Sequence, residues 1–202
     1  MQGIKYLWLI FIFYGFLSCT NETLAPSEYV QWVSEEENGL LKRKEIYPLK
    51  IEAQYKPIPF VIANEEQTND ISKYKYIERE KKLKGLQYYT LKLGISDATY
   101  NITNFGVEDE IQRQDRLSYF SFAMQNDIKL VESGDTLSCK LFHFERSYDL
   151  SPYRTFVLGF KQPQTDEIVD KTLILDLPFF KTGPIKLNYK KSDLEAIPNL
   201  KL

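Results

Sequence analysis

The segment Leu49-Lys50-Ile51-Glu52-Ala53-Gln54-Tyr55-Lys56 decides the fold class, because apolar and polar residues alternate strictly along it. Alternation with a period of two places every apolar side chain on one face of an extended strand and every polar side chain on the other. Such a strand has one buried face and one face in water, which is typical of antiparallel sheets. The segment therefore predicts a strand of an antiparallel sheet and not of a parallel α/β sheet.

Six further segments are predicted to be strands, because apolar, aromatic and β-branched residues recur in them at the same period. They are residues 86–96, 127–132, 136–146, 154–161, 171–177 and 185–189. The triplet Ser133-Gly134-Asp135 joins two of them with the composition of a hairpin turn. Several strands with one polar face each predict a mainly β fold, namely an antiparallel two-sheet β-sandwich that is immunoglobulin-like in character, with two or three inserted helices.

The clearest of the inserted helices is expected at residues 70–84. Ile71, Tyr74 and Ile77 recur there at helical spacing, and Gly85 is placed to end the helix. The segment is rich in lysine and arginine, so it could contact anionic lipid head groups. A solvated helix face with partial Glu–Lys pairing is the simpler interpretation.

Other segments are less regular. Residues 28–33 could form one or two helical turns with Ser27 as the N-cap, and residues 107–117 have the composition of a surface helix. Residues 119–124 are apolar and could continue that helix or open a strand. Residues 57–59, Pro-Ile-Pro, are expected to end the preceding strand.

The N-terminal sequence MQGIKYLWLIFIFYGFLSC has the pattern of an export signal. Lys5 precedes an apolar run at residues 6–17, which is shorter than the roughly 20 residues that a membrane-spanning helix needs. Ser18 directly precedes Cys19, and this arrangement resembles the lipobox of bacterial lipoproteins. The resemblance implies that Cys19 becomes the first residue of the mature protein and carries the lipid that attaches it to the membrane. An uncleaved N-terminal anchor and an ordinary secretory signal are the alternatives.

The chain is therefore expected to have three parts. Residues 1–18 are the lipoprotein signal peptide, residues 19–27 are the lipidated cysteine with a polar tether, and residues 28–202 are a single β-sandwich domain. Such a tether reaches only about 25 Å, so the domain stays close to the membrane. Glu22 is the only acidic residue of the tether. We therefore expect a lipid-anchored protein of the bacterial cell envelope, at the outer membrane and facing the periplasm.

Composition excludes several classes of protein. The formal net charge of −2 is too small to indicate nucleic acid as a partner. A hydrophobic fraction of 43% and an aromatic fraction of 14% exclude a disordered chain. The sequence holds two cysteines, so acylation of Cys19 would leave Cys139 without a disulfide partner. Cys139 is then expected to be a small, buried, apolar side chain of a strand.

The most specific local feature is Phe142-His143-Phe144-Glu145-Arg146. His143 and Glu145 share a face of a strand and could bind a metal or act as an acid and base. His143 is the only histidine, however, and a catalytic zinc site normally has three protein ligands. The motifs G-x-S-x-G, G-x-x-x-x-G-K-[ST] and G-x-G-x-x-G are absent from the sequence. We therefore expect neither enzymatic activity nor a cofactor, and we assign an interaction patch to His143, Glu145, Arg146, Tyr148 and Tyr153.

Four segments resemble a group of envelope lipoproteins of the Bacteroidota type. They are Asn38-Gly39, Gln54-Tyr55-Lys56-Pro57, Leu141 to Arg146 and Pro152-Tyr153. The resemblance implies a setting in the cell envelope and no activity. The first functional hypothesis is a non-enzymatic lipoprotein that binds an envelope protein as an accessory or assembly subunit. Because tyrosine and phenylalanine are abundant, a module that binds a glycan or another small ligand is the alternative.

Overall fold

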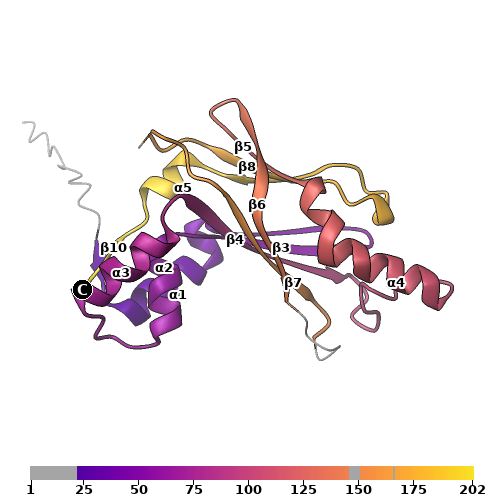
Figure 1. Cartoon of the computed structure of the whole chain (residues 1–202), viewed down its shortest axis with the longest axis horizontal. Coiled ribbons are helices and arrows are strands. Elements are labelled where there is room, and N and C mark those ends of the chain that lie inside the picture. The colour runs from indigo at the N-terminus through magenta and orange to yellow at the C-terminus, as the bar shows by residue number, and fades with distance from the viewer. Residues whose placement is uncertain (1–21, 146–150, 166) are drawn as a thin grey trace, which may run out of the picture.

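The computed structural model describes residues 22–145, 151–165 and 167–202, and its centre is one eight-stranded antiparallel sheet that is nearly closed into a barrel (Figure 1). The spatial order of the strands is β2-β3-β4-β7-β6-β5-β8-β9. Their bounds are β2 (Leu41–Ile46), β3 (Leu49–Lys56), β4 (Leu86–Ile95), β5 (Ile128–Glu132), β6 (Asp135–Glu145), β7 (Arg154–Lys161), β8 (Lys171–Leu175) and β9 (Ile185–Tyr189).

The prediction of a two-sheet β-sandwich was wrong, although the mainly β class and the predicted strand segments are confirmed. Antiparallel pairing runs without interruption from β2 to β9, so the strands do not divide into two sheets. The two edge strands approach each other, and Lys44 Nζ on β2 donates a hydrogen bond of 3.3 Å to the carbonyl of Lys186 on β9. One rolled sheet satisfies the alternation of apolar and polar residues as well as two stacked sheets do.

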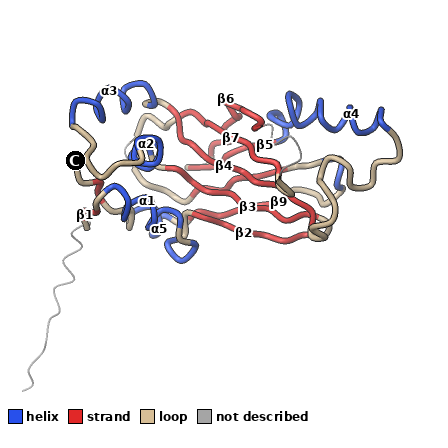
Figure 2. Tube along the Cα trace, turned by 90° about the horizontal axis from the view of Figure 1, so that it is seen from below, coloured by secondary structure: helices blue, strands red, loops and turns tan. Residues whose placement is uncertain are grey.

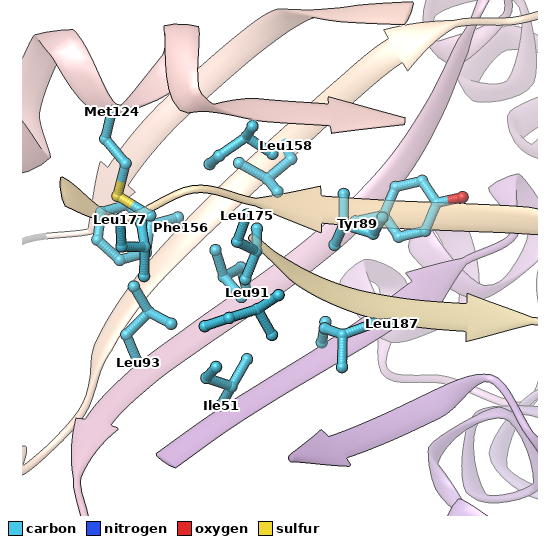
Figure 3. Packing of buried hydrophobic residues seen from close by; sticks show 14 of the residues in the cluster. Ile51, Tyr89, Leu91, Leu93, Met124, Phe156, Leu158, Leu175, Leu177 and Leu187 are labelled. Carbon is cyan, nitrogen blue, oxygen red and sulfur yellow. The ribbon is translucent and has the colours of Figure 1, made fainter. Parts of the chain in front are cut away.

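The apolar faces of the strands fill the interior of the near-barrel (Figure 3). Ile51, Leu91, Leu175 and Leu187 come from four different strands and point toward one another. The strand register explains this, because Ile51 lies opposite Leu93 and Leu173 lies opposite Leu187 across neighbouring strands. The same interior face continues along the strands with every second residue, except at the bulge of β6 between Cys139 and Leu141. The main core is therefore the inside of one rolled sheet.

The near-barrel has two ends, a proximal end and a distal end. The proximal end contains Lys56, Leu86, Glu132, Lys161 and Lys171, and the distal end contains Ile46, Leu49, Ile95, Ile128 and Leu175. Most of the helices gather at the proximal end, whereas α4 lies at the opposite end of the longest axis (Figures 1 and 2).

The proximal helices are α1 (Pro26–Ser34), α2 (Ile58–Glu66), α3 (Lys73–Leu83) and α5 (Lys191–Glu195). Helices α1, α2 and α5 share a second, smaller core that comprises Tyr29, Val33, Leu40, Phe60 and Leu194. Strand β1 (Thr23–Leu24) pairs in parallel with β10 (Asn199–Leu200) beside them. The described part of the segment predicted as a tether is therefore structured, since it forms β1 and the start of α1.

The predicted helix at 70–84 is confirmed as α3, which begins after Ser72, whose Oγ accepts a hydrogen bond from the Lys75 amide. The surface helix predicted at 107–117 is confirmed as α4 (Glu110–Ser118) with Asp109 as its N-cap. It continues through a π-helical turn, η2 (Tyr119–Ala123), and a 3₁₀ turn, η3 (Met124–Asp127). Two further 3₁₀ turns are η1 (Glu36–Asn38) and η4 (Pro178–Phe180).

Gly39 ends η1 in a conformation that requires glycine. Its φ is +75°, and a Cβ atom there would lie 2.1 Å from Asp193 Oδ2 of α5. Glycine therefore permits both the left-handed turn and the close approach of the C-terminal helix. This contact fixes α5 against the start of β2, where Lys42 also forms an ion pair with Asp193 at 3.3 Å.

Candidate functional site

The interaction patch predicted from the sequence is only partly described by the structure. His143 and Glu145 share the outer face of β6 and are exposed, as their alternation with Phe142 and Phe144 predicts. Arg146 and Tyr148 lie outside the described residues, as does Cys19. Among the described residues, no three His, Cys, Asp or Glu side chains gather as a metal site would require. His143 and Glu145 therefore face solvent on a strand wall.

Tyr153 of the same patch lies against Gly94 on the neighbouring strand β4. A Cβ atom on Gly94 would lie 2.7 Å from the Cδ1 atom of the Tyr153 ring, closer than van der Waals contact permits. The ring is nevertheless partly exposed. Tyr153 thus packs on the barrel wall through one face and offers the other to solvent.

A buried polar cluster closes the proximal end of the barrel interior, and we call Gln87, Glu132 and Lys171 the polar cluster. Lys171 Nζ donates hydrogen bonds to Glu132 Oε2 at 2.5 Å and to Gln87 Oε1 at 2.6 Å. Gln87 Nε2 donates to Glu132 Oε1 at 2.8 Å and to the carbonyl of Lys161 at 3.2 Å. All three side chains are buried, so the ion pair is shielded from water and its geometry is fixed by the amide.

The polar cluster was not predicted from the sequence. Each member occupies the interior-facing position of its strand that is nearest the proximal end. Gln87 precedes the interior residues Tyr89 and Leu91 of β4, and Glu132 follows the interior residue Leu130 of β5. Lys171 lies directly opposite Glu132 across β5 and β8. A polar residue in the apolar register at a strand end is the signal that could have revealed it.

Three tyrosines lie next to the polar cluster inside the same end. The ring centroids of Tyr55 and Tyr89 are 5.2 Å apart, and those of Tyr89 and Tyr189 are 5.5 Å apart. The Tyr189 hydroxyl donates to the carbonyl of Ala53 at 3.0 Å, whereas the buried Tyr89 hydroxyl has no hydrogen-bond partner among the described residues. Burial and the nearby Glu132 carboxylate raise the pKa of Tyr55 to about 12, and burial raises the pKa of Tyr89 and of Tyr189 further.

These tyrosines predict alkaline instability. The unfolded chain releases tyrosine protons near pH 10, while the folded protein retains them, so the free energy of unfolding should fall as pH rises above about 10. Absorbance of the phenolate near 295 nm and far-UV circular dichroism should be recorded together during an alkaline titration. We expect the phenolate signal of the buried tyrosines to appear only when the dichroism of the sheet is lost. Ionisation of every tyrosine near pH 10 in an intact fold would contradict this arrangement.

Two shallow pockets open on either side of residues 162–165, which follow β7. One has a volume of about 390 Å³ and is lined by Glu132, and the other has about 220 Å³ and is lined by Tyr55 and Lys171. The first volume is at the lower end of the range for small-molecule sites, and the second is below that range. The barrel interior itself is filled by the side chains of the core.

A different surface marks the distal end, and we call it the distal rim. Ten large apolar side chains are exposed among the described residues, and six of them belong to connections at this end. These six are Tyr47, Tyr100, Ile111, Phe122, Tyr153 and Phe179. They come from the β2–β3 turn, the β4–α4 loop, the helix of α4 and η2, the segment just before β7 and the turn η4 after β8.

Arg116 supports part of the distal rim from beneath. Its guanidinium donates to the carbonyls of Ile102, at 3.2 Å, and Phe105, which fixes the β4–α4 loop against α4. The same guanidinium lies 5.4 Å from the ring centroid of Phe179. Burial lowers the pKa of Arg116, although the group remains charged at neutral pH. The exposed ring of Phe179 is therefore held in place from below.

Two other expectations were that Cys139 is buried and that aromatic rings could be available to bind a glycan. Cys139 is buried as predicted, its Sγ lies 2.9 Å from the carbonyl oxygen of Leu141, and burial raises the pKa of its thiol. Most of the aromatic residues that motivated the glycan alternative pack into the core, including Tyr89, Tyr119 and Phe120. Their rings are therefore not available for stacking on a sugar.

No helix within the described residues is long and apolar enough to cross a membrane. Comparison of the chain with protein-family models, with curated proteins and with solved structures finds no match.

Proposed function

We propose that this protein is a non-enzymatic accessory protein of the bacterial cell envelope, which is anchored through lipid on Cys19 and binds a protein partner at the distal rim. The observation that carries the proposal is the gathering of exposed apolar side chains at the end opposite β1. Exposed apolar side chains, especially aromatic ones, are enriched at protein interfaces. Lipid on Cys19 would hold the end that contains β1 at the membrane, so a site at the opposite end would point away from it.

Negative charge beside the distal rim restricts the kind of protein surface that could bind there. Residues 108–115 hold four carboxylates, on Glu108, Asp109, Glu110 and Asp115, against the single guanidinium of Arg113. Ile111 lies among them in the sequence and is 72% exposed, and Phe122 on the following turn η2 is 74% exposed. The partner surface should therefore combine an apolar pocket with basic side chains, which would also direct its approach.

Site-specific crosslinking in intact cells tests the partner. A photoreactive amino acid at Ile111 should give a discrete adduct with one envelope protein, whereas the same group at Ser138, on the exposed wall of β6, should not. Adding Phe122→Asp should reduce the adduct about 10-fold or more, as expected when an interface loses an apolar anchor. Leu202→Asp is the matched control, because Leu202 is an exposed apolar residue outside the distal rim, and it should leave the adduct unchanged. Equal adducts from both positions, or no effect of Phe122→Asp, would remove the proposed interface.

The anchor is tested separately. Cys19→Ala should release the protein from the membrane fraction, and mass spectrometry of the mature N-terminus should find an acylated Cys19 in the unaltered protein. A Cys19→Ala protein that stays in the membrane fraction would show that attachment does not depend on this residue.

A further inference from the structure

Helix α3 exposes an apolar face that no described segment covers. None of its residues is buried, and Tyr74 and Ile77 are 80% and 52% exposed. The side that faces α2 is formed instead by half-buried residues such as Tyr76, Arg79 and Leu83. Positions 73, 77 and 81 are four residues apart, so Ile77 shares the outer face with Lys73 and Lys81.

The basic residues of α3 and its C-terminal end divide into those with a carboxylate partner and those without one. Lys75 and Arg79 form ion pairs with Glu66 and Glu65 of α2, and Lys82 pairs with Glu78 within the helix. The ammonium groups of Lys73, Lys81 and Lys84 have no carboxylate partner among the described residues. The outer face therefore combines exposed apolar side chains with unpaired positive charges, which is the composition of helices that lie in a membrane interface.

The position of α3 in the molecule agrees with this composition. Figure 1 shows α3 at the same end as the β1–β10 pair, where the described part of the chain begins. Figure 2, seen from a perpendicular direction, again places α3 and β1 at one end and α4 at the other. A lipid on Cys19 would bring this end of the domain to the bilayer.

We propose that α3 lies on an anionic lipid surface, with Tyr74 and Ile77 in the head-group region and with Lys73, Lys81 and Lys84 on lipid phosphates. The inference rests on the proposed anchor for its geometry and adds a second attachment to it. One attachment leaves an anchored domain free to rotate. A second attachment at α3 would fix the orientation of the domain and direct the distal rim away from the bilayer.

The test uses the full acylated chain reconstituted into vesicles of phosphatidylethanolamine with phosphatidylglycerol, and into vesicles of phosphatidylcholine alone. An environment-sensitive fluorophore is attached at Ile77→Cys or, as a matched control, at Ile111→Cys on the distal helix. Labelling is selective because Cys139 is buried and Cys19 carries lipid. Nitroxides on the lipid head groups should quench the label at position 77 several-fold more in anionic vesicles than in phosphatidylcholine. The label at position 111 should not be quenched in either vesicle.

A charge-reversed variant, Lys73→Glu/Lys81→Glu/Lys84→Glu, should lose the quenching at position 77 while the protein still floats with the vesicles. Floating protein without quenching at position 77 in anionic vesicles would overturn the inference and leave the anchor standing. Quenching at position 77 that charge reversal does not change would also overturn the inference and leave the anchor standing. A protein that fails to float with phosphatidylcholine vesicles would remove the anchor instead. In that case the contact of α3 with lipid is tested in anionic vesicles alone. Quenching of the label at position 77 would support the inference, and absence of quenching would overturn it.

Discussion

Replacement of Lys171 by methionine is expected to lower the free energy of unfolding by about 3–5 kcal/mol. Methionine keeps most of the length of the lysine side chain but removes the ammonium group. The carboxylate of Glu132 is then left buried without its cation, and Gln87 Oε1 loses its donor. A buried charge without a partner is among the strongest single-residue causes of destabilisation.

Urea unfolding of the unaltered protein and three variants measures this effect. The set is the unaltered protein, Lys171→Met, Glu132→Leu and the double variant. The double variant should lose less than the sum of the two single variants, because removal of both charges leaves an apolar pair with no orphaned ion. Lys140→Met is the control, since Lys140 is exposed on the neighbouring strand β6, and it should change the free energy by less than about 0.5 kcal/mol. Additive losses in the double variant would mean that the polar cluster does not act as a unit.

The strands could be predicted from the sequence, whereas the way they assemble could not. Alternation in Leu49–Lys56 depends only on which face of the strand is buried, and the structure confirms it. Pairing of β4 with β7, and of β5 with β8, depends on segments far apart in the chain. Periodicity carries no information about those partners, so a sandwich and a near-barrel could not be distinguished.

The sequence pattern was also insufficient to predict α2 and part of the candidate site. Pro57 and Pro59 were interpreted as the end of a strand, but proline is also favoured in the first turn of a helix, where α2 begins. For His143 and Glu145 the shared strand face was predicted correctly. The polar cluster was missed because Glu132 and Lys171 meet only through the pairing of β5 with β8.

Replacement of Phe156 by alanine should have a similarly large effect, about 3–5 kcal/mol. Phe156 is fully buried in β7, and its ring centroid lies 5.1 Å from that of Phe144 and 5.7 Å from those of Phe120 and Phe142. These rings come from β6, from β7 and from η2. Their packing therefore connects the barrel wall to the helical segment that carries the distal rim.

Urea unfolding should give losses in the order Phe156→Ala, Phe156→Leu and Phe122→Ala. Leucine fills part of the cavity that alanine leaves, and so its loss should be smaller. Phe122→Ala is the matched control, because this phenylalanine is exposed on η2 and should contribute less than about 0.5 kcal/mol to stability. A loss below about 1 kcal/mol for Phe156→Ala would contradict a rigid aromatic core. It would also mean that the distal rim depends on other contacts, such as those of Arg116 with Phe179 and the carbonyl of Phe105.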